Sequence, residues 1–378
     1  MLAVVATTTA ATDGARSLRA AVCHEFGGPL RVETVHLDPP GADEVSVDVR
    51  ACAICASDLH AAAGSWGGDL PAIHGHEASG VVRRIGPGVP AVAPGDRVVV
   101  SLLRSCRACF FCDIGSPHLC AGRDDFDLAH TTRLRTIDGA PIAQGVYTGA
   151  FAEAVVVHAS QVAPVPDGVP FEAAALLACG VATGYGAATK SAPVPAGSTV
   201  AVIGAGGVGL NTVQGAVARG ARRILAVDVS EAKLADALEF GATDVATVDD
   251  APGRLAALTD GRGADLVFVT VGSTAAIEQG LGWCRRGGTT VVVGMTAGGE
   301  HVRIETSGFA SDGKHLVGSF LGSTDLQNDV ADLAGRYLGG ELLLDELVPP
   351  RYPHARNPEA IASPATGEVR RNVIVFDA

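Results

Sequence analysis

The stretch TVAVIGAGGVGLNTVQGAVARGARRILAVD, residues 199–228, decides the fold of this chain of 378 residues. Residues 199–203 form a short apolar β-type run, and residues 223–227 form a second one. Between them, Gly204, Gly206 and Gly209 occupy a Gly-x-Gly-x-x-Gly pattern that opens a helical stretch to about residue 219. Such a strand–turn–helix unit lets backbone N–H groups approach a pyrophosphate at the helix N-terminus. The stretch therefore predicts a dinucleotide site.

An acidic residue at the end of the second run indicates which dinucleotide binds. Asp228 follows Gly209 by 19 residues, the distance expected of an acceptor for the adenosine ribose hydroxyls. Its carboxylate repels a 2′-phosphate, so we expect NAD in preference to NADP. Gly207 and Val208, inside the turn, belong to the same predicted site. The alternative interpretation is a glycine-rich turn followed by an aspartate that caps a helix.

The regions on either side of this stretch differ in character. After it, residues 231–240 read as a helix and residues 265–271 and 289–293 as strands, an alternation that predicts a parallel, doubly wound sheet. Before residue 180, β-type runs at 31–35, 45–51, 80–85, 97–100 and 154–157 are separated by glycine and proline turns. They predict an irregular, largely antiparallel β domain, to which a last run at 372–376 returns.

The predicted fold class is therefore α/β, with two domains. The β domain is expected over residues 1–180 and 320–378, and the Rossmann domain over residues 181–319. Residues 1–18 are rich in Ala and Thr and lack a basic segment followed by an apolar one. We expect them to form a ragged N-terminus and not a secretion signal.

The composition excludes several classes of function. The chain carries 28 Lys and Arg against 41 Asp and Glu, whereas nucleic-acid-binding surfaces need clustered cations. No uninterrupted apolar run reaches the roughly 18 residues that a membrane helix needs, since glycines break the richest stretches, around residues 173–189 and 199–210. Nine cysteines are too few for a disulfide scaffold, and their clustering indicates metal binding in a reducing compartment. We expect a cytoplasmic protein without nucleic-acid or membrane partners.

Four cysteines in one short segment form the most specific motif in the chain. Cys106, Cys109, Cys112 and Cys120 are spaced by two, two and seven residues. Four thiolates close a tetrahedral shell around Zn²⁺ and leave no position for water, which predicts a structural zinc site in a lobe over about residues 104–122. An iron–sulfur cluster would use the same number of cysteines and is the alternative.

A second set of metal ligands is dispersed along the chain. Two thiolates and an imidazole, from Cys55, His76 and Cys179, would leave a fourth position open, which is the arrangement of a catalytic zinc. Spacing does not join these three residues, and the pattern around each one alone favours a buried small residue or a structural histidine over a metal ligand.

The order of these motifs along the chain is similar to that of a known protein family. Cys-x-Ser-Asp-x-His at residues 55–60, Gly-His-Glu at 75–77, the four cysteines, Cys-Gly-Val-x-Thr-Gly at 179–184 and the glycine-rich turn follow one another. From about residue 20 onward the chain resembles the zinc-dependent medium-chain alcohol dehydrogenase family, in the branch with a Cys/His/Cys catalytic zinc that includes thiol-dependent formaldehyde dehydrogenases. The resemblance implies a GroES-like β domain, two zinc ions per chain, NAD, and a homodimer.

The resemblance also implies roles for single residues. Cys55, His76 and Cys179 would bind the catalytic zinc, and Ser57 and His60 would remove the proton of the alcohol. The alternatives are that Ser57 caps a helix and that His60 is merely exposed. The carboxylates expected behind the metal ligands are Asp58 and Glu77.

Further residues are assigned to the cofactor and the substrate by the same resemblance. Beyond the glycine-rich turn and Asp228, the predicted cofactor contacts are Lys233, Val271, Val293 and Arg371. The side chains expected to line the substrate space are Trp66, Leu102 and Met295. A primary aliphatic or aromatic alcohol and its aldehyde is the expected substrate class.

Three hypotheses of function follow. The first is an oxidoreductase that interconverts an alcohol and its aldehyde or ketone by hydride transfer with NAD. The second is a thiol-dependent formaldehyde dehydrogenase, for which no clear cationic cluster that would hold a thiol cofactor is visible in the sequence. The third is a non-catalytic NAD-binding scaffold or sensor that keeps only the four-cysteine zinc.

Overall fold

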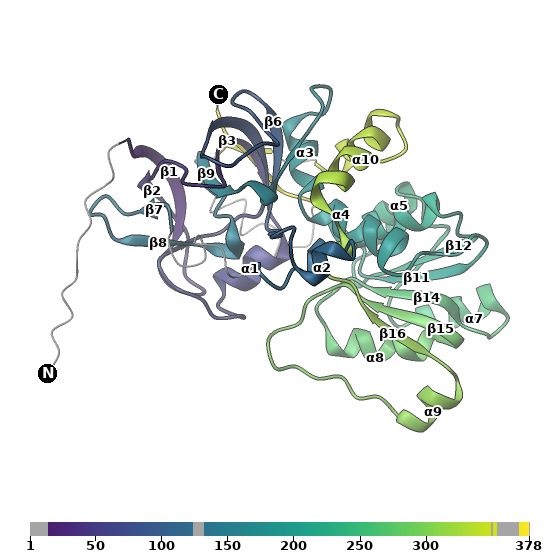
Figure 1. Ribbon diagram of the computed structural model, residues 1–378. Coiled ribbons are helices and arrows are strands. Elements are labelled where there is room, and N and C mark those ends of the chain that lie inside the picture. The colour runs from purple at the N-terminus through teal and green to yellow at the C-terminus, as the bar shows by residue number, and fades with distance from the viewer. Residues whose placement is uncertain (1–13, 124–131, 349–350, 354–369, 378) are drawn as a thin grey trace, which may run out of the picture.

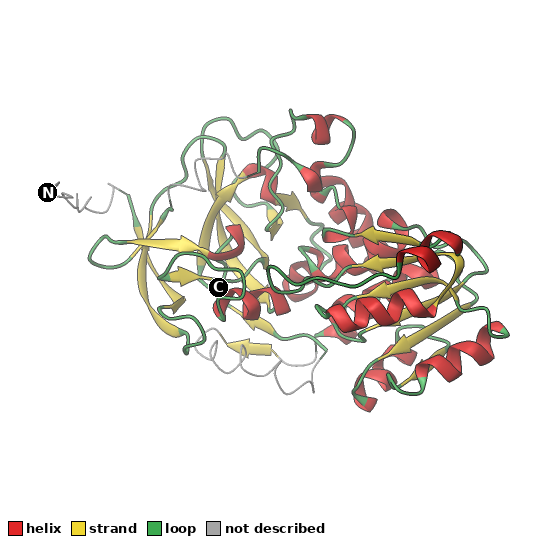
Figure 2. Ribbon diagram, turned by 90° about the horizontal axis from the view of Figure 1, so that it is seen from below, coloured by secondary structure: helices red, strands yellow, loops and turns green. Residues whose placement is uncertain are grey.

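The computed structural model describes residues 14–123, 132–348, 351–353 and 370–377. Two units lie side by side, one rich in strands and one in which strands and helices alternate (Figure 1). Helices surround the sheet of the second unit, whereas the first unit is built mainly of strands (Figure 2).

The first unit contains a closed barrel and a seven-stranded sheet. The barrel strands are β1 (Arg16–Cys23), β2 (Arg31–Leu37), β7 (Leu134–Arg135), β8 (Pro141–Gln144) and β4 (Ala72–Ile73). The sheet has the order β10 (Val162–Pro164), β6 (Arg97–Ser101), β5 (Glu77–Ile85), β3 (Glu44–Ala53), β18 (Val373–Val375) and β17 (Arg351–Pro353), and β9 (Ala154–His158) also pairs with β3. Most pairs are antiparallel; β4 with β8 and β17 with β18 are parallel.

Short helices connect these strands. They are α1 (Ala56–Ala62), α2 (Phe110–Asp113) and the 3-10 turns Pro117–Leu119, Gly145–Tyr147 and Ala159–Gln161. Helix α1 follows β3 closely, and the predicted catalytic ligand Cys55 lies in the short connection between them.

The second unit is a six-stranded parallel sheet covered by helices. Its order is β13 (Asp244–Ala246), β12 (Arg223–Val227), β11 (Thr199–Ile203), β14 (Ala264–Val269), β15 (Cys284–Val292) and β16 (His315–Gly318). The helices are α5 (Gly207–Ala218), α6 (Glu231–Glu239), α7 (Ala251–Thr259), α8 (Thr274–Trp283) and α9 (Thr306–Ser311). All five residues of β11 are buried, which explains its unbroken apolar sequence, because a central parallel strand is covered on both faces.

Helices at the junction pack the two units together. They are α3 (Phe171–Leu177), α4 (Gly180–Gly186) with a π-helical turn (Ala187–Ser191), α10 (Leu326–Leu338), and the 3-10 turns Leu321–Ser323 and Asp345–Leu347. One apolar core includes Ala51 of β3, Leu176 of α3, Val200 of β11 and Leu333 of α10. The junction is therefore packed as a continuous core, and the predicted catalytic ligand Cys179 lies in it.

The fold class predicted from the sequence is confirmed, and β11 and β12 have the predicted bounds. The expectation for residues 16–18 was wrong: they begin β1, which pairs with β2, while residues 1–13 lie outside the described part. The local composition did not predict this strand, because the hydrogen bonds that stabilise it come from β2. Helix α10 was also not predicted. Among the described residues no single helix is long and apolar enough to span a bilayer, and α3 with α4 and its π-helical extension passes that test only as a pair bent by 49°.

Candidate active site

One carboxylate organises the predicted catalytic ligands. Helix α1 begins directly after Cys55, and Asp58 lies in its first turn with only 1% of its surface exposed. One of its oxygens accepts a hydrogen bond from the backbone N–H of Cys55 at 3.1 Å. The other accepts from the backbone N–H of Gly75 at 2.9 Å and lies 2.8 Å from Nδ1 of His76. Asp58 therefore fixes the backbone of one predicted ligand and the ring of another.

The three predicted catalytic ligands converge in the fold. Cys55, His76, Cys179 and Glu77 are all buried, and their ligand atoms lie within 4.8 Å of one another. The Asp58 carboxylate lies against Nδ1 of His76, so the neutral ring carries its lone pair on Nε2, and Nε2 has no hydrogen-bond partner among the described residues. A buried, unpaired imidazole nitrogen beside two thiol sulfurs is a donor set that fits zinc.

The two cysteines of this cluster are electrostatically unequal. The pKa of the Cys55 thiol lies well below its ordinary value because Cys179 donates a hydrogen bond to it, which outweighs the opposite effect of burial. That same hydrogen bond, together with burial, raises the pKa of Cys179. Because zinc binds thiolates, binding of the metal at this pair would release protons.

Arg371 joins the ligand cluster to the glycine-rich turn. It is buried, forms an ion pair with Glu77, and packs over Gly180 and Gly207, where an added Cβ would collide with its side chain. Burial raises the pKa of Glu77 to about 7, and the charge of Arg371 acts in the opposite direction. The arginine predicted to hold the cofactor pyrophosphate thus lies at the N-terminus of α5, where a bound anion is favoured.

The three motif glycines each have the environment that a dinucleotide turn requires. Gly204 has a φ of +97°, which turns the chain sharply after β11. A Cβ on Gly206 would meet nothing within 4 Å, so this position is open to a ligand. A Cβ on Gly209 would overlap the carbonyl of Gly204, so a side chain there would part the helix from the strand. The turn fits a pyrophosphate.

Asp228 braces this turn from the end of β12. Its carboxylate accepts hydrogen bonds from the backbone N–H of Ala205 at 2.8 Å and of Ser230 at 3.0 Å. Ser230, and not Asp228, is the N-cap residue of α6, which disfavours the helix-cap interpretation. Lys233 lies in the first turn of α6 and is partly exposed.

The two valines assigned to the cofactor lie at the ends of neighbouring strands. Val271 follows β14, is 36% exposed and packs against Gly204, whereas Val293 follows β15 and is buried. Both positions lie at the carboxyl edge of the parallel sheet, where open α/β sheets bind their ligands.

The proposed relay residues share a helix. Ser57 and His60 are three residues apart on α1 and therefore lie on one face. Both are partly exposed. The N-cap of α1 is Cys55, so the alternative that Ser57 caps the helix is not what the structure shows.

The predicted substrate residues occupy two different settings. Trp66 and Met295 are 36% and 53% exposed, and the Trp66 indole N–H donates at 3.2 Å to the carbonyl of Thr296, the residue that follows Met295. Leu102 packs against the core that contains Cys55 and Cys179. Leu102 therefore packs against the same core as the ligand cluster, and the other two side chains are partly exposed.

The four-cysteine lobe also has the geometry of a metal site. Sulfur–sulfur distances are 3.6 Å from Cys109 to Cys112, 3.9 Å from Cys109 to Cys120 and 3.5 Å from Cys106 to Cys120. Tetrahedral zinc with Zn–S bonds of about 2.3 Å separates its sulfurs by about 3.8 Å. Backbone N–H groups of Cys112 and Ala121 lower the pKa of Cys109 to about 6. The lobe fits a closed zinc site.

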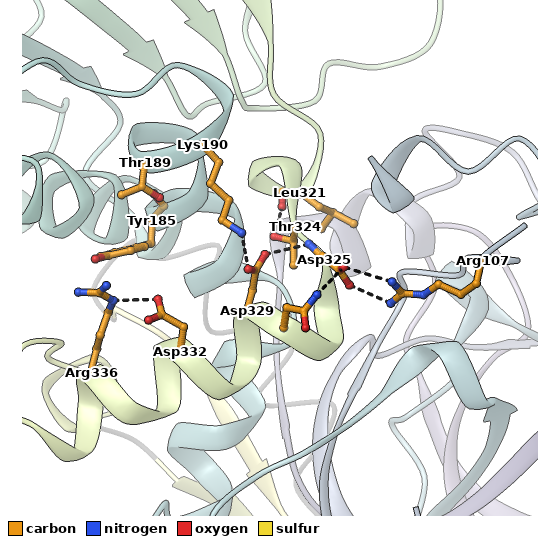
Figure 3. Close-up of polar contacts among 11 residues, drawn as sticks. Arg107, Tyr185, Thr189, Lys190, Leu321, Thr324, Asp325, Asp329, Asp332 and Arg336 are labelled. Atoms are coloured by element: carbon orange, nitrogen blue, oxygen red, sulfur yellow. Dashed lines mark hydrogen bonds and ion pairs between the residues drawn. The ribbon is translucent and has the colours of Figure 1, made fainter. Parts of the chain in front are cut away.

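Sequence reasoning missed how this lobe is anchored. Arg107, between two of its cysteines, forms two hydrogen bonds with Asp325, at 2.8 and 3.2 Å. Asp325 precedes α10, and Asp329 in the first turn of α10 pairs with Lys190, as Figure 3 shows. Neither partner could be paired from the sequence, since more than 200 residues separate Arg107 from Asp325.

Comparisons with known proteins agree with this geometry. Residues 41–167 match the family model of the alcohol dehydrogenase GroES-like domain, and residues 207–336 match that of zinc-binding dehydrogenases. An NDMA-dependent alcohol dehydrogenase of Amycolatopsis methanolica is 35% identical over 95% of this chain and 99% of its own length.

Two solved structures resemble the whole fold. Benzyl alcohol dehydrogenase of Acinetobacter calcoaceticus is 28% identical, with a TM-score of 0.90 over 96% of this chain and 100% of its own. A zinc-binding dehydrogenase of Sinorhizobium meliloti 1021, bound to NADP, is 28% identical, with a TM-score of 0.79 over 95% of this chain and 99% of its own. The motif order, the two ligand clusters and these matches agree, and the chain belongs to the zinc-dependent medium-chain alcohol dehydrogenase family.

Proposed function

We propose that the protein interconverts an alcohol and its aldehyde or ketone by hydride transfer with NAD, at a zinc ion held by Cys55, His76 and Cys179. The observation that carries this proposal is the buried, unpaired Nε2 of His76 beside two thiols. Relatives named as alcohol dehydrogenases support alcohol oxidoreduction as the reaction.

The chain's own residues divide the chemistry among them. A zinc ion here would supply Lewis-acid catalysis that lowers the pKa of the alcohol, and NAD would accept the hydride. Asp58 orients the ring of His76. Ser57 is the proposed first acceptor of the alcohol proton and passes its own proton toward His60, which is exposed enough to release it to solvent.

The preference for NAD rests on Asp228. Its carboxylate lies at the end of β12 and is turned toward the glycine-rich turn, so a 2′-phosphate would meet a negative charge there. The Sinorhizobium relative binds NADP, which makes this preference worth testing directly. We expect kcat/KM with NAD to exceed that with NADP by at least about 10-fold, since like-charge juxtaposition costs more than about 1.4 kcal/mol.

A second mode of cofactor use is suggested by the Amycolatopsis relative, whose name states a dependence on NDMA. In that mode the reduced cofactor would stay bound and would be reoxidised by NDMA as a second substrate. The thiol-dependent formaldehyde reaction is the alternative enzyme, because it would use the same metal ligands. The non-catalytic scaffold was expected to keep only the four-cysteine zinc, and the convergence of Cys55, His76 and Cys179 counts against it.

The oligomeric state and the cellular compartment of the protein are also part of the proposal. We propose a homodimer, since β16 ends the parallel sheet and its outer edge is unpaired among the described residues. The two cysteine clusters suit a reducing compartment, so we propose the cytoplasm. Size-exclusion chromatography with light scattering tests the first of these two statements.

The first experiment measures zinc per chain, together with NADH absorbance over a panel of primary aliphatic and aromatic alcohols with NAD. Two zinc ions and NADH release support the proposal. Two zinc ions with turnover only when NDMA is added identify the second mode, and turnover of formaldehyde only with a thiol identifies the thiol-dependent enzyme. One zinc ion and no turnover with any of these would overturn the enzyme assignment.

A further inference from the structure

Trp66 makes a contact that its expected role in the substrate space does not require. It lies in the loop after α1, in the strand-rich unit, and its indole N–H donates to the carbonyl of Thr296 at 3.2 Å. Thr296 lies in the loop after β15, in the parallel-sheet unit. The hydrogen bond therefore joins the two units at the surface, away from their shared core.

The same indole supports the proposed relay histidine. The rings of Trp66 and His60 have their centroids 5.5 Å apart and are inclined by 34°. Among the residues that the structure describes, no hydrogen bond or ion pair holds the His60 imidazole. A partly exposed imidazole without such a bond turns freely unless packing restrains it, and the ring of Trp66 is placed to provide that packing.

The acceptor loop is itself held by the cofactor site. A Cβ on Gly272 would overlap the carbonyl of Met295, and one on Gly294 would overlap the backbone of Val271, so these two loops lie backbone against backbone. Val271 in turn packs against Gly204 of the dinucleotide turn. A continuous set of contacts runs from the dinucleotide turn through Thr296 to Trp66.

We infer that Trp66 is a positioning residue for the proton relay: it holds the His60 imidazole in place, and the hydrogen bond to Thr296 makes that support depend on the cofactor-binding unit. The inference rests on the proposed function, because it concerns the proton of the same alcohol. Binding of NAD, by fixing the loops at residues 271 and 294–296, is expected to tighten the support.

A residue that only lines the substrate space behaves differently. Changing it alters KM, by an amount that depends on the size of the alcohol. Changing a positioning residue lowers kcat to a similar extent for small and large alcohols, and the loss vanishes when the residue it positions is already missing.

The test is a double-mutant cycle. Trp66→Phe keeps an aromatic ring but loses the donor, and we expect about a 3-fold lower kcat, the cost of one hydrogen bond. Trp66→Leu also loses the ring, and we expect about a 10-fold lower kcat for ethanol and benzyl alcohol alike. In a His60→Gln background, Trp66→Leu should cause no further loss. Additive losses in the cycle, or losses confined to KM of the larger alcohol, would overturn the inference.

The matched control is Thr296→Ala. The acceptor is a backbone carbonyl, so this variant keeps the hydrogen bond and should retain wild-type kcat. A loss as large as that of Trp66→Phe would show that the threonine side chain matters instead, and would count against the inference.

A second readout does not need turnover. The chain has two tryptophans, Trp66 and Trp283, so Trp283→Phe leaves Trp66 as the sole fluorophore. Adding NAD should reduce acrylamide quenching of Trp66, and His60→Leu in this background should change its emission. If these changes occur in a protein that oxidises no alcohol, the proposed function fails while the contact stands. If the protein oxidises alcohols but neither added NAD nor His60→Leu changes the fluorescence of Trp66, the inference fails and the proposed function stands.

Discussion

The two cysteine clusters of this chain bring possible metal ligands together in opposite ways, one from a short segment and the other from distant parts of the sequence. The four-cysteine lobe draws all its ligands from fifteen consecutive residues, and three of them are partly exposed. Cys55, His76 and Cys179 come from three distant segments of the chain and are all buried. The lobe offers four sulfurs, which closes a zinc site. The dispersed cluster offers two sulfurs and one nitrogen, which would leave the fourth position of a bound zinc open.

The difference teaches where each cluster gets its geometry. In the lobe the short connections hold the sulfurs 3.5–3.9 Å apart with little help from the rest of the chain. In the dispersed cluster the geometry depends on Asp58, on Arg371 and on the core that joins the two units. A local cluster stabilises its own segment, while a dispersed one depends on the whole fold. The following variants test that contrast.

The largest effect is expected from the dispersed cluster. Cys55→Ser or His76→Asn should lower kcat/KM by about 10³-fold, because a catalytic zinc contributes several kcal/mol to the transition state. Zinc content should fall from two ions to one while the thermal midpoint changes little. Cys52→Ala is the matched control, a buried cysteine three residues away that lies outside the cluster, and it should keep both ions. Retention of two zinc ions in Cys55→Ser would break the assignment of this ligand.

The carboxylate behind the ligands should give the next largest effect. Asp58→Asn keeps the shape of the side chain but replaces one carboxylate oxygen with an amide N–H. The charged acceptor for Nδ1 of His76 is then lost. Loss of such a partner commonly costs 10- to 100-fold in metal affinity or activity, and we expect about that range here. Competition with a chelator measures the affinity of each zinc separately. Only the dispersed site should weaken; equal weakening at the lobe would contradict the idea that the two clusters are independent.

The lobe is expected to act on stability and not on chemistry. Cys112→Ser should remove the other zinc ion and lower the thermal midpoint by roughly 10 °C, since a structural zinc contributes several kcal/mol. The kcat of the folded variant at 25 °C should stay near the wild-type value, because no cysteine of the lobe belongs to the dispersed cluster. Cys284→Ala, a buried cysteine in the parallel sheet, is the control for loss of a thiol. A lobe variant that is stable but inactive would reverse the comparison.

The same contrast explains what the sequence could predict. The glycine-rich turn, strands β11 and β12 and the four-cysteine lobe follow from local patterns, because their signals and their structures span the same few residues. Joining His76 to Cys179, 103 residues later, needed a resemblance to a family, since no spacing rule reaches that far. The fold supplies the proximity by ending β3 and starting α4 in one core.

Two contacts between distant residues were predicted neither from local patterns nor from the family resemblance. The pair Arg107–Asp325 and the hydrogen bond from Trp66 to Thr296 join residues more than 200 positions apart. Neither sequence periodicity nor a family motif marks such partners, because exposed side chains at either end have many alternatives. Strand β1 was missed for a related reason: its order comes from pairing with β2 and β4, not from its own composition.

The smallest expected effect tests how self-contained the lobe is. Arg107 and Asp325 are partly exposed, and exposed ion pairs contribute about 0.2–1 kcal/mol. Arg107→Gln and Asp325→Asn should each lower the thermal midpoint by about 1–3 °C, and the double variant should lose little more than either one alone. Release of zinc from the lobe to a chelator should quicken by only about 2-fold, since the sulfurs keep their spacing. A much faster release would mean that α10 holds the lobe together, and that the local cluster, like the dispersed one, takes its geometry from the rest of the chain.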